Sequence, residues 1–386
     1  MNERERFRAM VRFETPDHVP IFGFPGAPGM SRGCMRGTWD RLVATGMPAG
    51  VGSHDLDDGE RVESWKRYWG TADPMTLDFR LERDVPGFRT TSHVEGEYEI
   101  IESESGAVRR QVLDNEATYS MPEFITYPVR DRESWEFYRK RQTPRGRMPA
   151  DEMEERCRAY DDRDRPLVIS AGGTVGSVRS LMGPEAACTA LYDDPELVRD
   201  IMQWKLDMTR EYVFPLIERL RPEVVALWED ICGNHAMMVS PRQFEEFGGD
   251  YYRETCAAAR ANGADLVTVD SDGNVGELVP LLASFGVNGL YPFEAKGNAD
   301  LISLRRELPE FVMFGWLEKE TVNEGNEDRI EEEIMSKVPP MLERGGYFPN
   351  GDHGIQPLAT FDGMRRFMTI LHEVCGNPEG TFPRTE

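Results

Sequence analysis

Ala264-Asp265-Leu266-Val267-Thr268-Val269-Asp270-Ser271-Asp272-Gly273-Asn274-Val275 is the stretch that decides the fold. Its apolar and partly β-branched centre, residues 266–269, is typical of a strand buried on both faces. Two carboxylates, a glycine and an asparagine follow and indicate a turn. Leucines at helical spacing then begin at Leu278. The segment therefore predicts a parallel strand that runs through an acidic loop into a helix.

Strand and helix patterns alternate from residue 165 onward, which implies a parallel sheet with right-handed crossovers. The predicted strands are residues 167–171, 224–227, 266–269, 287–293, 311–316 and 346–349. Residues 19–24 and one less visible strand bring the number near eight. We therefore expect an α/β fold, a (β/α)8 TIM barrel, over residues 1–386 as a single domain.

Residues 55–163 differ from the rest of the chain and are expected to be an insertion that forms a lid or cover over the barrel. Residues 88–102 and 108–120 alternate loosely between apolar and charged side chains around Ser105-Gly106, which predicts a β-hairpin or small sheet. Residues 131–163 are strongly charged and predict a helical cover with a solvated face.

Composition excludes several classes of function. The net charge is −24 and the pI is about 4.8, which argues against nucleic acid and anionic membrane surfaces as partners. The 6 cysteines are scattered without a CxxC pair, the charged N-terminus has no apolar stretch behind it, and no run is long enough for a membrane span. We expect a reduced, soluble, cytoplasmic protein.

Acidic side chains gather at the ends of several predicted strands, where α/β barrels place their chemistry. The set is Glu229, Asp230, Asp270, Asp272, Glu294 and Asp352, with His353 beside the last of them. Several carboxylates in a dry site cannot all stay ionised without a cation or hydrogen-bond donors. They would either bind a metal or hold one carboxyl protonated as a general acid. Taken singly, Asp230, Asp270 and Asp272 are equally well explained as loop-capping or turn residues.

The whole chain resembles the uroporphyrinogen decarboxylase superfamily, which also contains corrinoid-linked methyltransferases. The segments that carry the resemblance are residues 4–7 and 13–20, Glu229-Asp230, Ser240-Pro241, residues 270–274, residues 315–319, and residues 346–353. The resemblance implies a (β/α)8 barrel with its pocket at the carboxyl ends of the strands.

Two departures from the family pattern narrow the function. Haem-pathway decarboxylases carry an Arg-rich motif after the first strand, but residues 22–28 here contain no arginine, so porphyrinogen decarboxylation is not expected. The zinc methyltransferases use a His-x-Cys-Gly loop and a later cysteine. The matching positions here are Asp270, Asp272 and Asp352, which we predict as ligands of zinc or another divalent metal such as Mg²⁺ or Mn²⁺. Loss of the metal is the remaining alternative.

The resemblance therefore implies a methyltransferase that moves a methyl group from a small methyl ether or methylamine-type substrate to a separate corrinoid protein. The predicted catalytic residues are Glu229, Asp230, Asp270 and His353, and the predicted substrate-binding residues are Trp228, Glu294 and Trp316. The resemblance also suggests a homodimer.

Two other functions remain open at this stage. One is a metal-independent decarboxylase or lyase that acts on a small carboxylated substrate, which would need a basic residue in the pocket. The candidates for that residue are Arg32, Arg36, Arg179 and Lys319. The other is a non-catalytic protein that binds a ligand or partner, which the density of acids at strand ends makes the weakest of the three.

Overall fold

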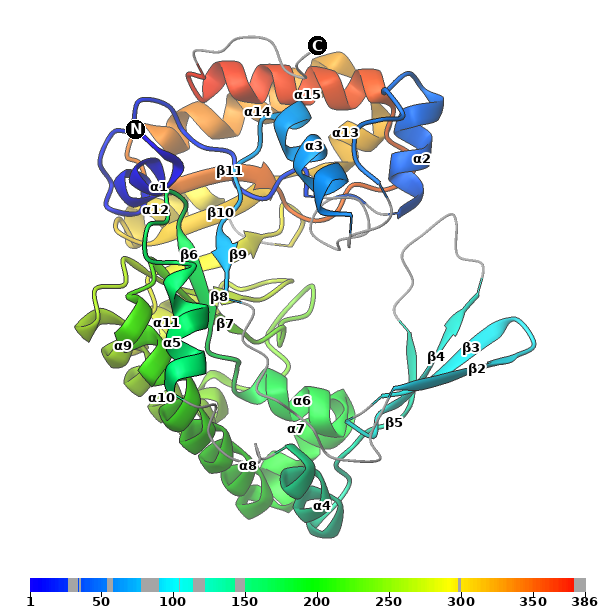
Figure 1. The fold of residues 1–386 in the computed structure, drawn as a ribbon, viewed down its shortest axis with the longest axis vertical. Coiled ribbons are helices and arrows are strands. Elements are labelled where there is room, and N and C mark those ends of the chain that lie inside the picture. The colour runs from blue at the N-terminus through cyan, green and yellow to red at the C-terminus, as the bar shows by residue number, and fades with distance from the viewer. Residues whose placement is uncertain are drawn as a thin grey trace.

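A curved sheet of seven parallel strands forms the centre of the protein (Figure 1). The strands, in sheet order, are β1 (Met75–Thr76), β6 (Leu167–Ser170), β7 (Val224–Trp228), β8 (Leu266–Asp270), β9 (Gly289–Phe293), β10 (Val312–Leu317) and β11 (Tyr347–Gly351). The structure is a computed structural model that describes residues 1–26, 34, 36–53, 58–77, 90–103, 105–113, 122–142, 150–297 and 300–377. The predicted parallel order from residue 165 onward is confirmed.

Helices connect the strands and cover the outer face of the sheet. They are α1 (Glu3–Val11), α2 (Arg36–Ala44), α3 (Gly59–Trp69), α4 (Arg132–Gln142), α5 (Ala150–Arg158), α6 (Val175–Met182), α7 (Pro184–Asp193), α8 (Pro195–Met208), α9 (Phe214–Leu220), α10 (Pro241–Ala261), α11 (Leu278–Phe285), α12 (Leu301–Glu307), α13 (Lys319–Glu324), α14 (Glu327–Leu342) and α15 (Phe361–Val374), with a π-helical turn η1 (Thr209–Val213) between α8 and α9. None of the helices in the described part of the chain has the length and apolar character that a membrane span needs.

Short sequence signals fix where these helices begin. Ser240 caps α10 in a capping box with Gln243, and Pro241 occupies the first helical position. Asp194 accepts a hydrogen bond from the backbone N–H of Leu197 at the start of α8. In each case the capping side chain and the proline after it form the sequence pattern that predicts a helix start.

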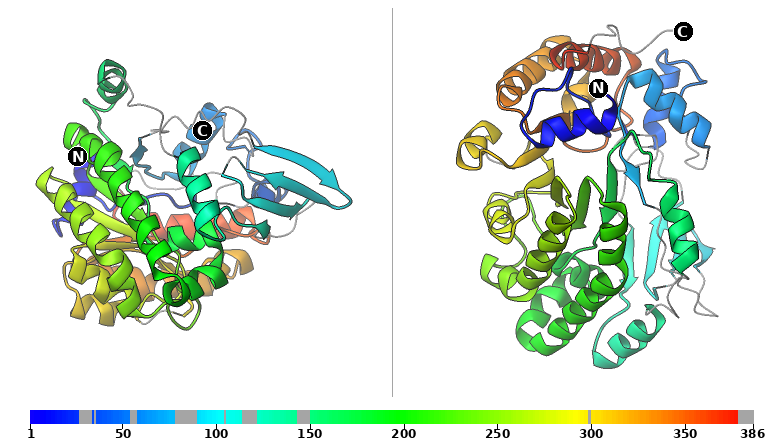
Figure 2. Two further views of the ribbon diagram at one scale, coloured as in Figure 1. Left: turned by 90° about the horizontal axis from the view of Figure 1, so that it is seen from below. Right: turned by 60° about the vertical axis from the view of Figure 1, so that its left-hand side comes forward.

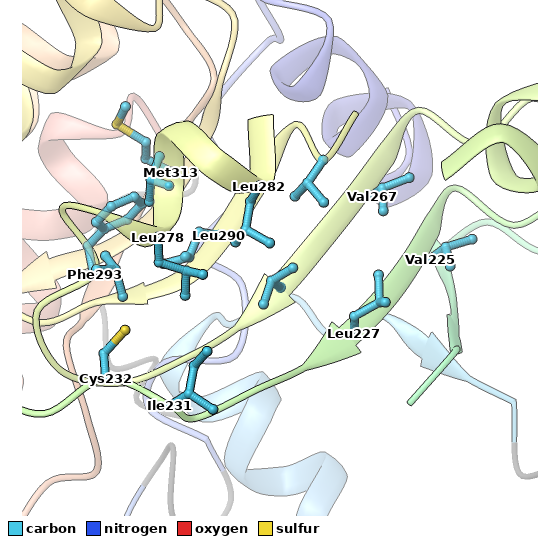
Figure 3. Packing of buried hydrophobic residues seen from close by; sticks show 14 of the residues in the cluster. Val225, Leu227, Ile231, Cys232, Val267, Leu278, Leu282, Leu290, Phe293 and Met313 are labelled. Atoms are coloured by element: carbon cyan, nitrogen blue, oxygen red, sulfur yellow. The ribbon is translucent and has the colours of Figure 1, made fainter. Parts of the chain in front are cut away.

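Buried apolar side chains pack between the outer face of the sheet and its helices (Figure 3). Val225 and Leu227 of β7 and Val267 of β8 point to the side where Leu278 and Leu282 of α11 lie, and all five are buried. Alternate residues of a strand point to opposite faces. The residues between them, such as Ala226 and Thr268, therefore face the inside of the curved sheet.

The inside of the sheet is closed at its amino end by α1. Phe7 of α1 stacks against Phe348 of β11 with ring centroids 5.3 Å apart, and its ring meets that of Phe22 at 5.2 Å. Phe314 of β10 stacks on Phe348 at 4.5 Å. This aromatic cluster is a second core, separate from the one under the outer helices.

The expected eighth strand is only partly formed. Residues 19–24 were predicted as the first strand, but within the described residues this segment makes a single parallel bridge between Phe22 and Ala72. The neighbouring β1 is two residues long. Prolines and glycines around this segment explain the short pairing, because proline lacks the N–H that a ladder requires.

The inserted region contains a second, antiparallel sheet that projects from the body (Figure 1; Figure 2, left). It consists of β2 (Thr91–Glu95), β3 (Tyr98–Glu102), β4 (Val108–Val112) and β5 (Glu123–Thr126). Its connection to the parallel sheet runs through α4 and α5. A hairpin or small sheet followed by helices was predicted here, and the sheet has four strands.

Helix α1 is fastened to the sheet by a buried carboxylate. Glu223, at the amino end of β7, is 2% exposed and accepts hydrogen bonds from Arg4 at 2.8 Å and Arg163 at 3.0 Å. The backbone N–H of Leu167 donates to its second oxygen at 2.9 Å. Glu223 thereby connects α1, the segment before β6, and β7.

We expect Glu223→Ala to lower the free energy of unfolding by about 3–5 kcal/mol, because it leaves the buried Arg163 without its partner. Urea denaturation followed by circular dichroism measures this change. Glu254→Ala is the matched control, since Glu254 pairs with Arg210 on the exposed surface. An equal loss of stability in both variants would contradict the anchoring role.

Candidate active site at the carboxyl ends of the strands

The parallel sheet brings the predicted acids to one edge. Trp228, the last residue of β7, is in register with Asp270, the last residue of β8. Glu294 directly follows β9, and Asp352 directly follows β11. The carboxyl ends of neighbouring parallel strands lie together, which is where α/β barrels bind their ligands.

Glu294 is the centre of an acidic group. The backbone N–H of Gly273 donates to its Oε2 at 3.1 Å. Burial and the nearby carboxylates of Asp272 and Asp352 raise the pKa of Glu294, while Gly273 and the Lys319 ammonium act against this rise. Asp272 and Asp352 therefore lie close enough to Glu294 for their charges to affect it.

Asp352 joins the loops that follow β9 and β10. One of its oxygens accepts from the backbone N–H of Ala295 at 3.0 Å and the other from that of Lys319 at 3.2 Å. Its side chain is almost completely buried. Burial raises the pKa of Asp352, although the two N–H donors and Lys319 stabilise its charged form. The group as a whole therefore favours holding a proton at a pH where isolated carboxylates have lost theirs.

The metal site expected at Asp270, Asp272 and Asp352 does not assemble in this arrangement. Among the residues that the structure describes, no three His, Cys, Asp or Glu side chains are grouped so that they could hold a metal ion. Both oxygens of Asp352 already accept backbone hydrogen bonds. Zinc or another divalent metal at these residues stays a prediction, and no chemical step below depends on it.

Glu229 is buried and holds a loop in place. It has no exposed surface and accepts four hydrogen bonds. The donors are the backbone N–H and hydroxyl of Thr174 at 2.7 and 2.6 Å, the N–H of Gly176 at 2.7 Å and the hydroxyl of Tyr252 at 2.7 Å. With its oxygens occupied, Glu229 fits a positioning role better than the catalytic role that the sequence suggested.

Asp230, Arg179 and Trp228 form a second cluster at the end of β7. Arg179 of α6 donates to Oδ2 of Asp230 at 2.7 Å and also to its backbone carbonyl, and its guanidinium lies 5.9 Å from the Trp228 ring centroid. Asp230 has a φ of +48°, a conformation that is rare without glycine and that clusters at functional sites. Arg179 neutralises Asp230, and Trp228 is half-buried beside them.

Trp316 packs under α14, and its predicted substrate-binding role stays a prediction. Gly315 and Trp316 both have positive φ values, of +101° and +72°, so the inward–outward alternation of β10 is interrupted before the Trp316 side chain. The Trp316 ring is 7% exposed, and the ammonium of Lys337 in α14 lies 4.9 Å from its centroid. These contacts favour a structural role for Trp316 under α14.

His353 is half-buried beside Asp352. Its Nδ1 accepts a hydrogen bond from the backbone N–H of Gly354 at 2.8 Å. Since Nδ1 is the acceptor, the neutral ring carries its proton on Nε2. This contact fixes the tautomer, while the catalytic role expected of His353 stays a prediction.

The basic residues needed by a decarboxylase are only partly described. Arg32 lies outside the described residues, and so does the side chain of Arg36. Arg179 is paired with Asp230, and Lys319 faces Glu294 and Asp352. The two basic groups that can be placed therefore stand beside carboxylates of the protein itself.

A cavity of about 340 Å³ lies inside the curved sheet. Thr268, Tyr291, Phe314, Asn350 and Phe22 are among the side chains that line it. Sequence analysis did not select these residues. The signal was nevertheless available, because Thr268 precedes Asp270 by two residues and Asn350 precedes Asp352 by two, so each pair faces the same side of its strand.

A parallel α/β sheet with acidic side chains at its carboxyl edge is the architecture of barrel-type enzymes. The model of the family described as uroporphyrinogen decarboxylase (URO-D) matches residues 118–374. The match covers more than half of the chain, and the chain therefore belongs to the uroporphyrinogen decarboxylase family.

The fold of this chain can be compared with two solved structures, both at low sequence identity. The chain is similar to a methyltransferase from Methanosarcina mazei with a TM-score of 0.58 and 14% sequence identity, over 97% of this chain and 99% of that one. A uronate isomerase from Bacillus halodurans C-125 matches with a TM-score of 0.23 and 10% identity, over 62% of this chain and 61% of that one, which is too weak to support an argument. No curated protein matches the chain.

Gly176, near the start of α6, packs against the backbone of Glu229. A Cβ added at Gly176 would lie 1.8 Å from the Glu229 carbonyl oxygen, so no side chain fits there. We expect Gly176→Ala to lower the free energy of unfolding by about 3 kcal/mol, because the backbone must move apart. Gly59→Ala is the control, since Gly59 also begins a helix but has nothing within 4 Å of the added Cβ. Chemical denaturation that shows both variants unchanged would contradict the close contact.

Proposed function

We propose that this protein is a methyltransferase that takes a methyl group from a small methyl ether or methylamine-type substrate. A separate corrinoid protein would accept the methyl group. The observation that carries the proposal is the acidic group of the buried Asp352 and the half-buried Glu294 and Asp272, which favours a protonated carboxyl at the strand ends. Membership in the family and the likeness in fold to a methyltransferase support it.

A protonated carboxyl addresses the main difficulty of demethylation, because the oxygen or nitrogen that loses the methyl group is a poor leaving group. When the bond between the methyl carbon and the substrate oxygen or nitrogen breaks, its electron pair stays on that atom. A carboxylic acid at Glu294 would donate the proton that this atom needs. Asp272 and Asp352 would keep Glu294 protonated, and Lys319 would stabilise the carboxylate left after the transfer.

A complete (β/α)8 barrel is part of this proposal. The N–H of Ala72 donates to the carbonyl of Ile21 at 2.9 Å and the N–H of Gly23 to that of Ala72 at 3.0 Å. The side-chain amide of Asn350 in β11 donates to the carbonyl of Phe22 at 3.0 Å. Residues 21–23 thus contact Ala72, three residues before β1, on one side and β11 on the other, as the first strand of a closed barrel would.

Decarboxylation of a small carboxylated substrate is the second candidate function, favoured by the family that the chain matches. It needs a cation to hold the substrate carboxylate, and Arg179 and Lys319 already face carboxylates of the protein. Release of CO2 in the absence of any methyl acceptor would identify this activity.

The experiment that tests the proposal is a methyl-transfer assay with a purified corrinoid protein and a panel of methyl ethers and methylamines. Methylation of the corrinoid, followed by its absorption spectrum, is the expected result with at least one donor. Absence of methylation across a panel tested with several corrinoid proteins would refute the proposal. A homodimer and a cytoplasmic location stay predictions, and light scattering of the purified chain tests the first.

We expect Glu294→Gln to reduce methyl transfer about 100-fold, because general acid catalysis typically contributes 10²–10⁴-fold. The rate of the unmodified protein should fall as the pH rises through the raised pKa of Glu294, and the variant should lose this dependence. Glu277→Gln is the control, because Glu277 is exposed and lies after the neighbouring strand β8, at the start of α11; this variant should keep both the rate and the pH profile. A Glu294→Gln variant with an unchanged profile would exclude Glu294 as the acid.

The neighbours of Glu294 predict shifts of that profile in opposite directions. Asp272→Asn removes a like charge that raises the pKa of Glu294, so the fall in rate should move to lower pH. Lys319→Met removes a cation that lowers it, so the fall should move to higher pH. The pH dependence of kcat measures both shifts, and movement of both variants in the same direction would contradict the assignment.

A further inference from the structure

The cavity inside the curved sheet lies one layer of side chains below the acidic group. Thr268 and Asn350, which line the cavity, each precede a strand-end acid by two residues. Because a parallel strand rises about 3.3 Å per residue, this separation is roughly 7 Å along the strand. A substrate held in the cavity could therefore extend its reacting atom toward the acids above.

Several aromatic side chains form part of the cavity wall. Phe22, Tyr291 and Phe314 line it, and Phe314 is backed by the stacked ring of Phe348. An apolar protein cavity of about 150 Å³ is large enough to hold benzene. The volume of about 340 Å³ therefore suits one aromatic ring with small substituents.

Asn350 gives the cavity a hydrogen-bonding preference. Its side chain is 1% exposed, and its Nδ2 donates to the carbonyl oxygen of Phe22 at 3.0 Å. A carbonyl oxygen can only accept, so this contact fixes the orientation of the amide. The Oδ1 atom is buried and has no hydrogen-bond partner among the described residues, and the same holds for Oγ1 of Thr268. A buried acceptor without a donor is costly, so a ligand that brings a donor gains affinity.

The charge of the cavity disfavours an anionic ligand. Lys66 lines it, but its ammonium is paired with Asp73 at 2.7 Å and with Glu63 at 2.9 Å. A carboxylate placed in the cavity would lose its hydration and would face the unpartnered oxygen of Asn350.

We infer that this cavity binds a neutral aromatic ring that carries a hydroxyl or N–H donor, with the donor bonded to Oδ1 of Asn350. The inference rests on the proposed function, since it names the non-reacting part of the methyl donor. The ring packs between Phe22, Tyr291 and Phe314, and the hydroxyl of Thr268 provides a second polar contact. The methyl-bearing group then extends toward Glu294.

Calorimetric titration of the full chain with phenol, methoxybenzene and benzoate tests the inference. Phenol has the ring and the donor, methoxybenzene has the ring alone, and benzoate carries a charge. We expect phenol to bind at least fivefold more tightly than methoxybenzene and benzoate to bind most weakly. Benzoate binding as tightly as phenol, or no binding by any of the three, would overturn the inference.

Two variants connect the preference to particular atoms. Asn350→Leu should abolish the preference for phenol over methoxybenzene while methoxybenzene still binds, a result that loss of folding cannot imitate. Thr268→Val should weaken phenol binding about threefold. Thr255→Val is the matched control, because Oγ1 of Thr255 is also buried without a partner but lies in α10, away from the cavity. An unchanged phenol preference in Asn350→Leu would also overturn the inference.

These measurements need no methyl transfer, so they separate the inference from the proposed function. Selective phenol binding without any methylation of corrinoid proteins would support the inferred ligand class and refute the proposed methyl transfer. Methyl transfer from aliphatic donors, with no binding of phenol, would support the proposed function and overturn the inference about the cavity.

Discussion

The buried carboxylate of Glu229 is the interaction on which the candidate site depends. It sits one residue beyond β7, has no contact with solvent, and collects donors from the loop after β6 and from α10. Burial alone raises the pKa of Glu229, and its donors from Thr174, Gly176 and Tyr252 oppose that rise. A buried carboxyl with this many donors is a rigid connection. It fixes the end of β7 against its neighbours, and thereby fixes where Asp230 and Arg179 can lie.

The same edge of the sheet contains two groups of acids with different electrostatics. Asp230 has Arg179 as a partner at 2.7 Å. Glu294 has two carboxylates near it that raise its pKa, and the N–H of Gly273 and the ammonium of Lys319 act against this rise. One carboxylate is thus paired with a cation, and another carboxyl is pushed toward the neutral form. A site that holds both kinds of carboxyl can supply a charged group and a proton donor.

Much of this arrangement could be predicted from the sequence, and the failures have local causes. The strand at residues 266–270 and the helix starts at Asp194 and Ser240 were predicted because each has a strong local signal. The packing of Trp316 under α14 could not be predicted, because it follows from the positive φ values of Gly315 and Trp316, which no local sequence pattern indicates. The first strand was overestimated because its apolar residues suggest pairing, while the surrounding prolines and glycines limit it to one bridge.

The roles of the acids were harder to predict than their positions. Glu229 and Asp230 are adjacent in the sequence, yet one is buried under donors and the other pairs with an arginine at the surface. Side-chain environment of this kind comes from distant segments, such as Thr174 and Tyr252, that no local pattern identifies. Asp352 illustrates the point further. The family resemblance predicts Asp352 as a metal ligand, while in the structure the backbone N–H groups of Ala295 and Lys319 donate to its oxygens. Its remaining influence is its charge, and that charge favours a proton on Glu294.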